Sequence, residues 1–196
     1  LWIAKLGGIE LHPFHSDVQP LDCPTSVVFD LDPGPRAGLA ECCKVALRLR
    51  DRLAGAGLSC HPKSTGATGL HVYVPLNSRV GHDRAKSFAR EIGRELCEGN
   101  EDLVTVRRSR EERLGKVFID WAQNNPLRSV VAPYSLRAMS LPSVATPLLW
   151  DEVESAARRD DPESLIFLAS DVLDRIERSG DLLAPILTET QLLPTL

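Results

Sequence analysis

The chain has 196 residues, of which 43% are hydrophobic and 26% are charged, and its formal net charge is −4. This length is enough for one domain with a hydrophobic core, and no apolar run is long enough to cross a bilayer. The N-terminus also lacks the charged segment and the long apolar stretch of a signal peptide. We therefore expect a globular protein with no membrane partner, and the absence of an initial Met suggests that the chain is part of a longer protein.

Hydrophobic periodicity predicts strands and helices that alternate along the chain. An amphipathic helix at the N-terminus is followed by predicted strands at residues 9–14, 26–31, 58–63, 70–75, 117–121 and 129–132. Predicted helices lie at residues 38–54 and 83–97 and, beyond Pro147, at residues 150–158 and 162–178. This order indicates an α+β fold, with a mixed or antiparallel sheet flanked by helices and a helical C-terminal segment.

Two neighbouring carboxylates end the first strong strand pattern, Val27-Val28-Phe29-Asp30-Leu31-Asp32. Residues i and i+2 of a strand point to the same face, so Asp30 and Asp32 are expected side by side where Pro33 ends the strand. Such carboxylates repel each other unless a proton or a cation lies between them, and Mg²⁺ and Mn²⁺ prefer oxygen ligands. From the residues alone, the alternative is a turn former or a helix N-cap.

A third carboxylate, Asp120, lies in the strand pattern at residues 117–121. Three aspartates are what a two-metal site for phosphoryl or nucleotidyl transfer needs. The residues just before this strand form a basic cluster, made of Arg107, Arg108, Arg110, Arg113 and Lys116. A local basic groove can bind phosphate although the net charge is negative, but a solvated face paired with Glu111 and Glu112 explains the cluster equally well.

The loop between the predicted strands at 58–63 and 70–75 reads Ser64-Thr65-Gly66-Ala67-Thr68-Gly69. Glycines let backbone N–H groups approach an anion closely, and Ser and Thr hydroxyls donate to phosphate oxygens. His71 begins the strand that follows. Many loops of this composition are only turns, so both interpretations remain open.

Four segments stand in the order and spacing of one known family. They are residues 29–34, residues 63–75, residues 117–124 and residues 132–137, with further matches at residues 1–16 and 143–150. Together they resemble the polymerase domain of bacterial ligase D, which belongs to the archaeo-eukaryotic primase superfamily. The resemblance implies a primase-polymerase catalytic core at residues 1–150, with a C-terminal helical extension at residues 151–196 packed on it.

The same resemblance implies a nucleotidyltransferase that adds nucleotides, preferentially ribonucleotides, to DNA 3′ ends in non-homologous end joining. Its partners would be gapped or broken DNA ends, nucleoside triphosphates, and the ligase and Ku proteins of end joining, in the bacterial cytoplasm near the nucleoid. Two Mn²⁺ or Mg²⁺ ions would serve as cofactors. Asp30 and Asp32 would hold both ions, and Asp120 would complete the site of the ion that activates the primer 3′-OH.

A second set of residues would bind the nucleotide if the resemblance holds, namely Thr65, Thr68, His71, Arg113, Gln123 and Arg137. His71 would contact the triphosphate, Thr65 would donate its hydroxyl to a phosphate, and Gln123 would help to place the nucleotide. The guanidinium groups of the two arginines would bond phosphate oxygens bidentately. Candidates for contacts with DNA are His12, Arg107 and Arg108.

Departures from the family leave an alternative open. Thr68 stands where the family usually has Lys, which removes a contact to the triphosphate worth about 1–3 kcal/mol, and Ala67 replaces a glycine. The family's basic N-terminal portion is also absent. A catalytically weak or inactive relative that binds DNA ends or nucleotides is therefore the alternative. A haloacid-dehalogenase-type phosphatase also ends a strand with Asp-x-Asp, but Gly34 stands where that motif has Thr.

Overall fold

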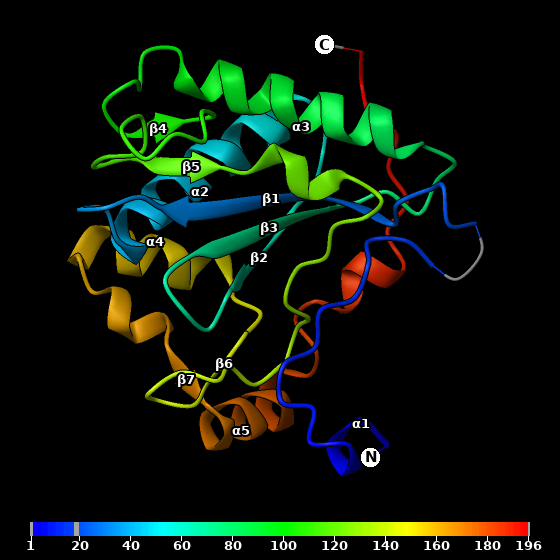
Figure 1. Cartoon of the computed structure of the whole chain (residues 1–196), viewed down its shortest axis with the longest axis vertical. Helices are drawn as coiled ribbons and strands as arrows, with labels where there is room; N and C mark the ends of the chain where they lie inside the picture. The colour runs from blue at the N-terminus through cyan, green and yellow to red at the C-terminus, as the bar shows by residue number, and fades with distance from the viewer. Residues whose placement is uncertain (1, 18–19, 196) are drawn as a thin grey trace.

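A five-stranded mixed sheet forms the centre of the computed structural model, which describes residues 2–17 and 20–195 (Figure 1). Its strands are β1 (Ser26–Pro33), β2 (His61–Ser64), β3 (Leu70–Pro75), β4 (Val104–Thr105) and β5 (Val117–Ile119). Their order across the sheet is β2-β3-β1-β5-β4. The central strand β1 pairs antiparallel with both β3 and β5, whereas β4 pairs parallel with β5.

Helices α2 (Leu39–Gly55) and α3 (His82–Cys97) cover one face of this sheet (Figure 1). Their buried side chains recur at helical spacing and share one hydrophobic cluster with Val27, Phe29 and Leu31 of β1. Because side chains alternate along a strand, the two aspartates of β1 lie on the opposite face.

The C-terminal part of the chain begins with α4 (Trp150–Arg159), which packs on α2 and joins the main hydrophobic cluster. Beyond it, β7 (Phe167–Leu168) pairs antiparallel with β6 (Ser143–Val144), and α5 (Ala169–Ser179) follows. Figure 1 shows this second sheet and α5 below the main sheet. The remaining elements are α1 (Trp2–Lys5), η1 (Trp121–Asn124), η2 (Pro162–Leu165) and η3 (Ala184–Leu187). The boundary at residue 150 stays a prediction.

The prediction of a helix at residues 162–178 is wrong for its first part, before α5 begins at Ala169. Residues 162–168 form η2 and β7, and Ile166 between them has an extended backbone, with φ −102° and ψ 118°. Pairing of Phe167 with Val144 and of Leu168 with Ser143 draws the chain out of helical geometry before α5 begins. None of the helices in the described ranges has the length and apolarity of a membrane span.

Two strand predictions also need correction. The strand predicted at residues 117–121 ends at Ile119, because the side chain of Asp120 accepts a hydrogen bond from the N–H of Ala122 at 3.2 Å and so begins η1. The strands predicted at 9–14 and 129–132 meet in an isolated bridge between Phe14 and Ser129 and in a hydrogen bond from the N–H of Ala132 to the carbonyl oxygen of Leu11 at 2.8 Å. These two segments are extended but form no ladder.

Candidate active site

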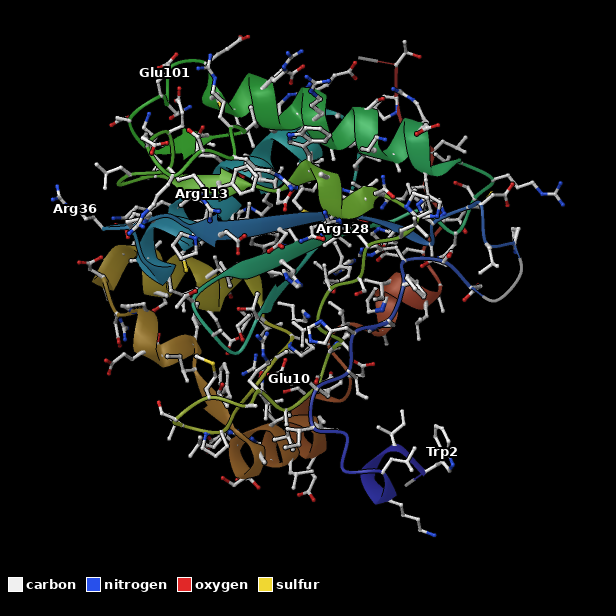
Figure 2. The ribbon with its side chains drawn as sticks, in the orientation of Figure 1. Trp2, Glu10, Arg36, Glu101, Arg113 and Arg128 are labelled. Carbon is white, nitrogen blue, oxygen red and sulfur yellow. The ribbon has the colours of Figure 1, made fainter. Side chains whose placement is uncertain are left out.

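The antiparallel neighbours of β1 bring the three predicted aspartates to one end of that strand. Asp30 lies opposite His71 of β3. Asp120, which follows β5, donates its backbone N–H to the carbonyl oxygen of Asp30 at 2.9 Å. Figure 2 shows Arg36 and Arg113 at this same end of β1.

The carboxylate of Asp30 is buried and has two polar neighbours. Its Oδ1 lies 3.3 Å from Nε2 of His71, and its Oδ2 accepts a hydrogen bond from Nε2 of Gln123, also at 3.3 Å. Although burial favours the neutral acid, His71 and Gln123 hold the pKa of Asp30 below its ordinary value. Burial, together with repulsion from Lys63, lowers the pKa of His71, and Nδ1 of this imidazole has no hydrogen-bond partner among the described residues.

The pKa of Asp32 shifts in the opposite direction to that of Asp30. Burial and the negative charge of Asp30 raise the pKa of Asp32 to about 6. Arg113 only partly offsets this effect, because its Nη2 lies 3.9 Å from Oδ2 of Asp32. Two carboxylates that repel each other in their ionised forms can bind a divalent cation that prefers oxygen ligands, because the cation offsets the repulsion.

Asp120 has a cationic neighbour of its own. Nη2 of Arg108 donates to both carboxylate oxygens, at 2.9 and 3.2 Å. Within residues 2–17 and 20–195, no group of three or more His, Cys, Asp or Glu side chains is arranged to hold a metal ion. The Asp30–Asp32 pair thus fits a divalent cation by its charge, whereas the carboxylate of Asp120 is occupied by Arg108. The metal-ligand role of the three aspartates stays a prediction.

The loop at residues 64–69 closes on its own threonine. Oγ1 of Thr65 donates to the carbonyl oxygen of Gly69 at 3.1 Å and accepts from the N–H groups of Ala67 and Gly69, both at 3.2 Å. This hydroxyl is therefore used inside the loop. Thr68, by contrast, is exposed at the tip of the loop.

The two predicted phosphate-binding arginines lie on different sides of the aspartates. Nη1 of Arg137 donates to the carbonyl oxygen of Thr65 at 2.9 Å, and its Nε lies 3.3 Å from Oε1 of Glu10. The guanidinium of Arg113 lies over the ring of Phe118, 4.7 Å from its centroid. Gly34 fixes this second position, because any side chain there would overlap the backbone of Arg113.

A cavity of about 290 Å³ joins most of the predicted residues. The predicted residues that line it are His12, Asp30, Asp32, Thr65, Thr68, His71, Gln123 and Arg137. Asp120 and Arg113 lie outside this lining. The sequence thus predicted most of the polar wall of one cavity.

All three predicted DNA-binding residues already have acidic partners. Nη1 of Arg107 lies 2.8 Å from Oε1 of Glu112, and this pair faces a separate hollow of about 720 Å³ beside α3. Arg108 binds Asp120, as described above. His12 lies in the cavity wall, with Nε2 3.1 Å from Glu10. Their contacts with DNA stay predictions.

Sequence reasoning gave no role to Lys63, although its side chain is fully buried beneath the cavity. Its Nζ donates to the carbonyl oxygen of Val131, which lines the cavity, and lies 5.6 Å from the ring centroid of Tyr73. Burial lowers the pKa of Lys63 to about 7, although the charge of Asp30 favours the ammonium. No sequence signal marks this burial, since a lysine in a strand is normally exposed.

A central strand that ends in paired aspartates, beside a histidine and a Ser/Thr-Gly loop on its antiparallel neighbour, defines a primase-polymerase type of catalytic core. The family model described as "LigD, primase-polymerase domain" matches residues 1–183. The chain belongs to this family, a family of nucleotidyltransferases, which confirms the predicted family and class of enzyme.

The curated relatives are much longer than this chain. It is 37% identical to the multifunctional non-homologous end joining protein LigD of Mycolicibacterium smegmatis, over 94% of this chain and 24% of that protein. It is 29% identical to the bifunctional non-homologous end joining protein LigD of Bacillus subtilis, over 92% of this chain and 29% of that protein. The chain therefore spans about a quarter of these relatives.

A solved structure has the same fold. The polymerase domain of Mycobacterium tuberculosis ligase D, in complex with DNA, superposes with a TM-score of 0.84 at 36% identity. The match covers 97% of this chain and 67% of that one. The expected α+β fold, with a mixed sheet flanked by helices, is confirmed.

Proposed function

We propose that this chain adds nucleotides to the 3′ ends of DNA in non-homologous end joining. The observation that carries the proposal is the cavity in which Asp30 and Asp32 share one wall with His71 and Arg137. Acidic and cationic groups on one small cavity suit a nucleotide, whose phosphates are anionic and are bound with divalent cations. The family of the chain supports this reading.

The proposed reaction is in-line attack of the primer 3′-OH on the α-phosphate of a nucleoside triphosphate. The 3′-OH loses its proton to water as a bond forms between the 3′ oxygen and the α-phosphorus, and pyrophosphate leaves with the electrons of the broken phosphoanhydride bond. Two Mn²⁺ or Mg²⁺ ions, when bound, would supply positive charge at the reacting oxygens. Asp30 and Asp32 would hold them, and Asp120 would join once Arg108 releases its carboxylate.

The remaining residues would orient the triphosphate. His71 and Arg137 would donate hydrogen bonds to its oxygens from the β3 side of the cavity, and Arg113 from the opposite side. Thr65 would act by shaping its loop, since its hydroxyl is already engaged. Gln123 would hold Asp30 and help to place the nucleotide, for which we propose a preference for ribonucleotides.

DNA ends would be the second substrate, in keeping with the DNA complex of the M. tuberculosis domain. His12 lines the cavity, from which it would contact a DNA strand. Arg107 and Arg108 would serve the same purpose after leaving their acidic partners. The names of the relatives support end joining. We further propose ligase and Ku proteins as partners, in the bacterial cytoplasm near the nucleoid.

Extension of a labelled gapped duplex with a 5′-phosphate tests the proposal. The assay contains Mn²⁺ and either rNTPs or dNTPs, and compares the wild type with Asp30→Asn, Asp32→Asn and the exposed control Asp102→Asn. We expect extension by the wild type and the control, faster with rNTPs, and its loss in both site variants. Equal extension by all variants would refute the site.

A second candidate function is a binding module with little or no catalysis. The contact of Arg108 with Asp120 favours it, because this contact occupies a proposed metal ligand. Binding of ATP or of the gapped duplex without any extension by the wild type would support this alternative.

A further inference from the structure

Arg137 approaches the 64–69 loop from a short hairpin. Its backbone N–H donates to the carbonyl oxygen of Ser143 at 2.9 Å, and the N–H of Ala145 donates to Ser135 at 2.9 Å. An antiparallel bridge joins Leu136 to Val144 between these bonds. The position of the Arg137 backbone is therefore set by the hairpin made of residues 134–137 and 143–145.

The 64–69 loop rests directly on this hairpin. Arg137 binds the carbonyl oxygen of Thr65, and Oγ of Ser143 donates to the carbonyl oxygen of Gly66. Gly66 has φ +69°, and a Cβ atom there would lie 2.8 Å from the backbone of Val144 and Ala145. Close contact and shared hydrogen bonds mean that the loop follows any shift of the hairpin.

Tyr134, the first residue of the hairpin, has an unfavourable backbone conformation. Its φ is +63°, a region that bulky side chains rarely adopt. Its N–H donates to the carbonyl oxygen of Ala145 at 2.7 Å, which ties this conformation to the hairpin register. The phenol donates to the carboxylate of Asp181, which also accepts from the N–H of Leu183 at 2.9 Å.

The hydrogen bond between Tyr134 and Asp181 supports this conformation from outside the hairpin. Strained residues persist where the surrounding structure fixes them, and they occur often at functional sites. The contacts form a series that runs from Asp181 through Tyr134 to the hairpin, and from the hairpin to Arg137 and the 64–69 loop.

We propose that Tyr134 is a positioning residue, which acts through the hairpin to aim Arg137 and the 64–69 loop at the nucleotide. The inference rests on the proposed nucleotidyl transfer. It adds that Asp181, in the C-terminal part of the chain, belongs to the support of the nucleotide site, although it lies outside the cavity lining.

The test measures kcat and KM for ATP in the gapped-duplex extension assay with Mn²⁺. We expect Tyr134→Phe and Asp181→Asn each to raise KM about fivefold, the factor that corresponds to one hydrogen bond of about 1 kcal/mol, with kcat changed less than twofold. The double variant should be no worse than either single one, because both remove the same bond. Asp174→Asn, an exposed acid on α5, is the matched control and should behave as the wild type.

A double-mutant cycle with Arg137→Lys separates positioning from a purely structural role. If Tyr134 acts through Arg137, Tyr134→Phe raises KM much less in the Arg137→Lys background than in the wild type. A lower Tm with unchanged KM, or an equal effect of Tyr134→Phe in both backgrounds, would overturn the inference but leave the proposed function intact. A wild type that neither extends DNA nor binds ATP would overturn both.

Discussion

Asn124 hydrogen-bonds both backbone polar groups of Val28. Its Oδ1 accepts from the N–H of Val28 at 2.9 Å, and its Nδ2 donates to the carbonyl oxygen at 2.8 Å. Both residues are buried, so this amide takes the place of a neighbouring strand beside β1, beyond the end of β5. The contact also fixes η1, and with it Gln123, next to Asp30.

Replacing Asn124 should destabilise the fold strongly. Asn124→Leu leaves a buried N–H and a buried C=O of Val28 without partners, so we expect the free energy of unfolding to fall by about 2–4 kcal/mol. Urea denaturation measures this change. Asn125→Leu is the control, because Asn125 makes one local side-chain bond, to the N–H of Leu127, and should cost less than about 1 kcal/mol. Equal losses in the two variants would contradict the role assigned to Asn124.

Lys63 should give the stability of the protein a distinctive pH dependence. Its pKa is about 7 in the folded state and 10.5 for an ordinary lysine, so between these values the unfolded chain binds the additional proton. Stability attributable to this group therefore rises with pH from about 7 to about 10.5, by at most about 1.4 kcal/mol per pH unit. Denaturation of the wild type and of Lys63→Met across this range measures the difference between their free energies of unfolding. If the variant lacks this slope, the difference should shrink as the pH rises. Parallel profiles would show that the ammonium is not buried as described.

Gly34 should resist even the smallest side chain. A Cβ atom there would overlap the carbonyl oxygen of Arg113, and the N–H of Gly34 is already bonded to Lys116 at 2.8 Å. We expect Gly34→Ala to destabilise the protein by about 1–3 kcal/mol and to displace Arg113 from Asp32. Gly55→Ala is the matched control, since Gly55 ends α2 with open space around it and should be neutral or slightly stabilising. Thermal unfolding compares the two, and a similar Tm in both would argue against the close approach.

Restoring a lysine at position 68 should strengthen nucleotide binding. Thr68 is exposed on the cavity wall, so Thr68→Lys adds a cation where the proposed triphosphate lies. We expect KM for ATP to fall about tenfold, as for a charge-assisted contact of about 1.4 kcal/mol. Thr188→Lys, which adds the same charge at an exposed position in the C-terminal tail, controls for nonspecific attraction. If both variants lower KM equally, Thr68 does not face the triphosphate.

Local periodicity was enough to predict the part of the site that lies on strands. Alternation along β1 placed Asp30 and Asp32 on one face, and the pattern at 70–75 placed His71 in a strand, although only the structure shows that this strand pairs with β1. The helices α2 and α3 followed from their apolar spacing.

Contacts between distant residues carry no such pattern. The helical periodicity of 162–178 could not show that Phe167 and Leu168 would pair with β6. The burial of Lys63 depends on the path of residues 129–132, and the contact of Arg108 with Asp120 depends on a loop without periodicity. These features required the assembled fold.

The supports of the 64–69 loop come late in the chain. Its contacts with Arg137, Ser143 and Thr146 span 72, 77 and 82 residues of sequence. On the ribosome, the β2–β3 pair can form well before these supports exist, since pairing between neighbouring segments needs only a short loop to close. A nascent chain therefore has no ordered nucleotide site until synthesis has passed residue 146, and ribosome-bound fragments that end earlier should leave this loop open to proteases.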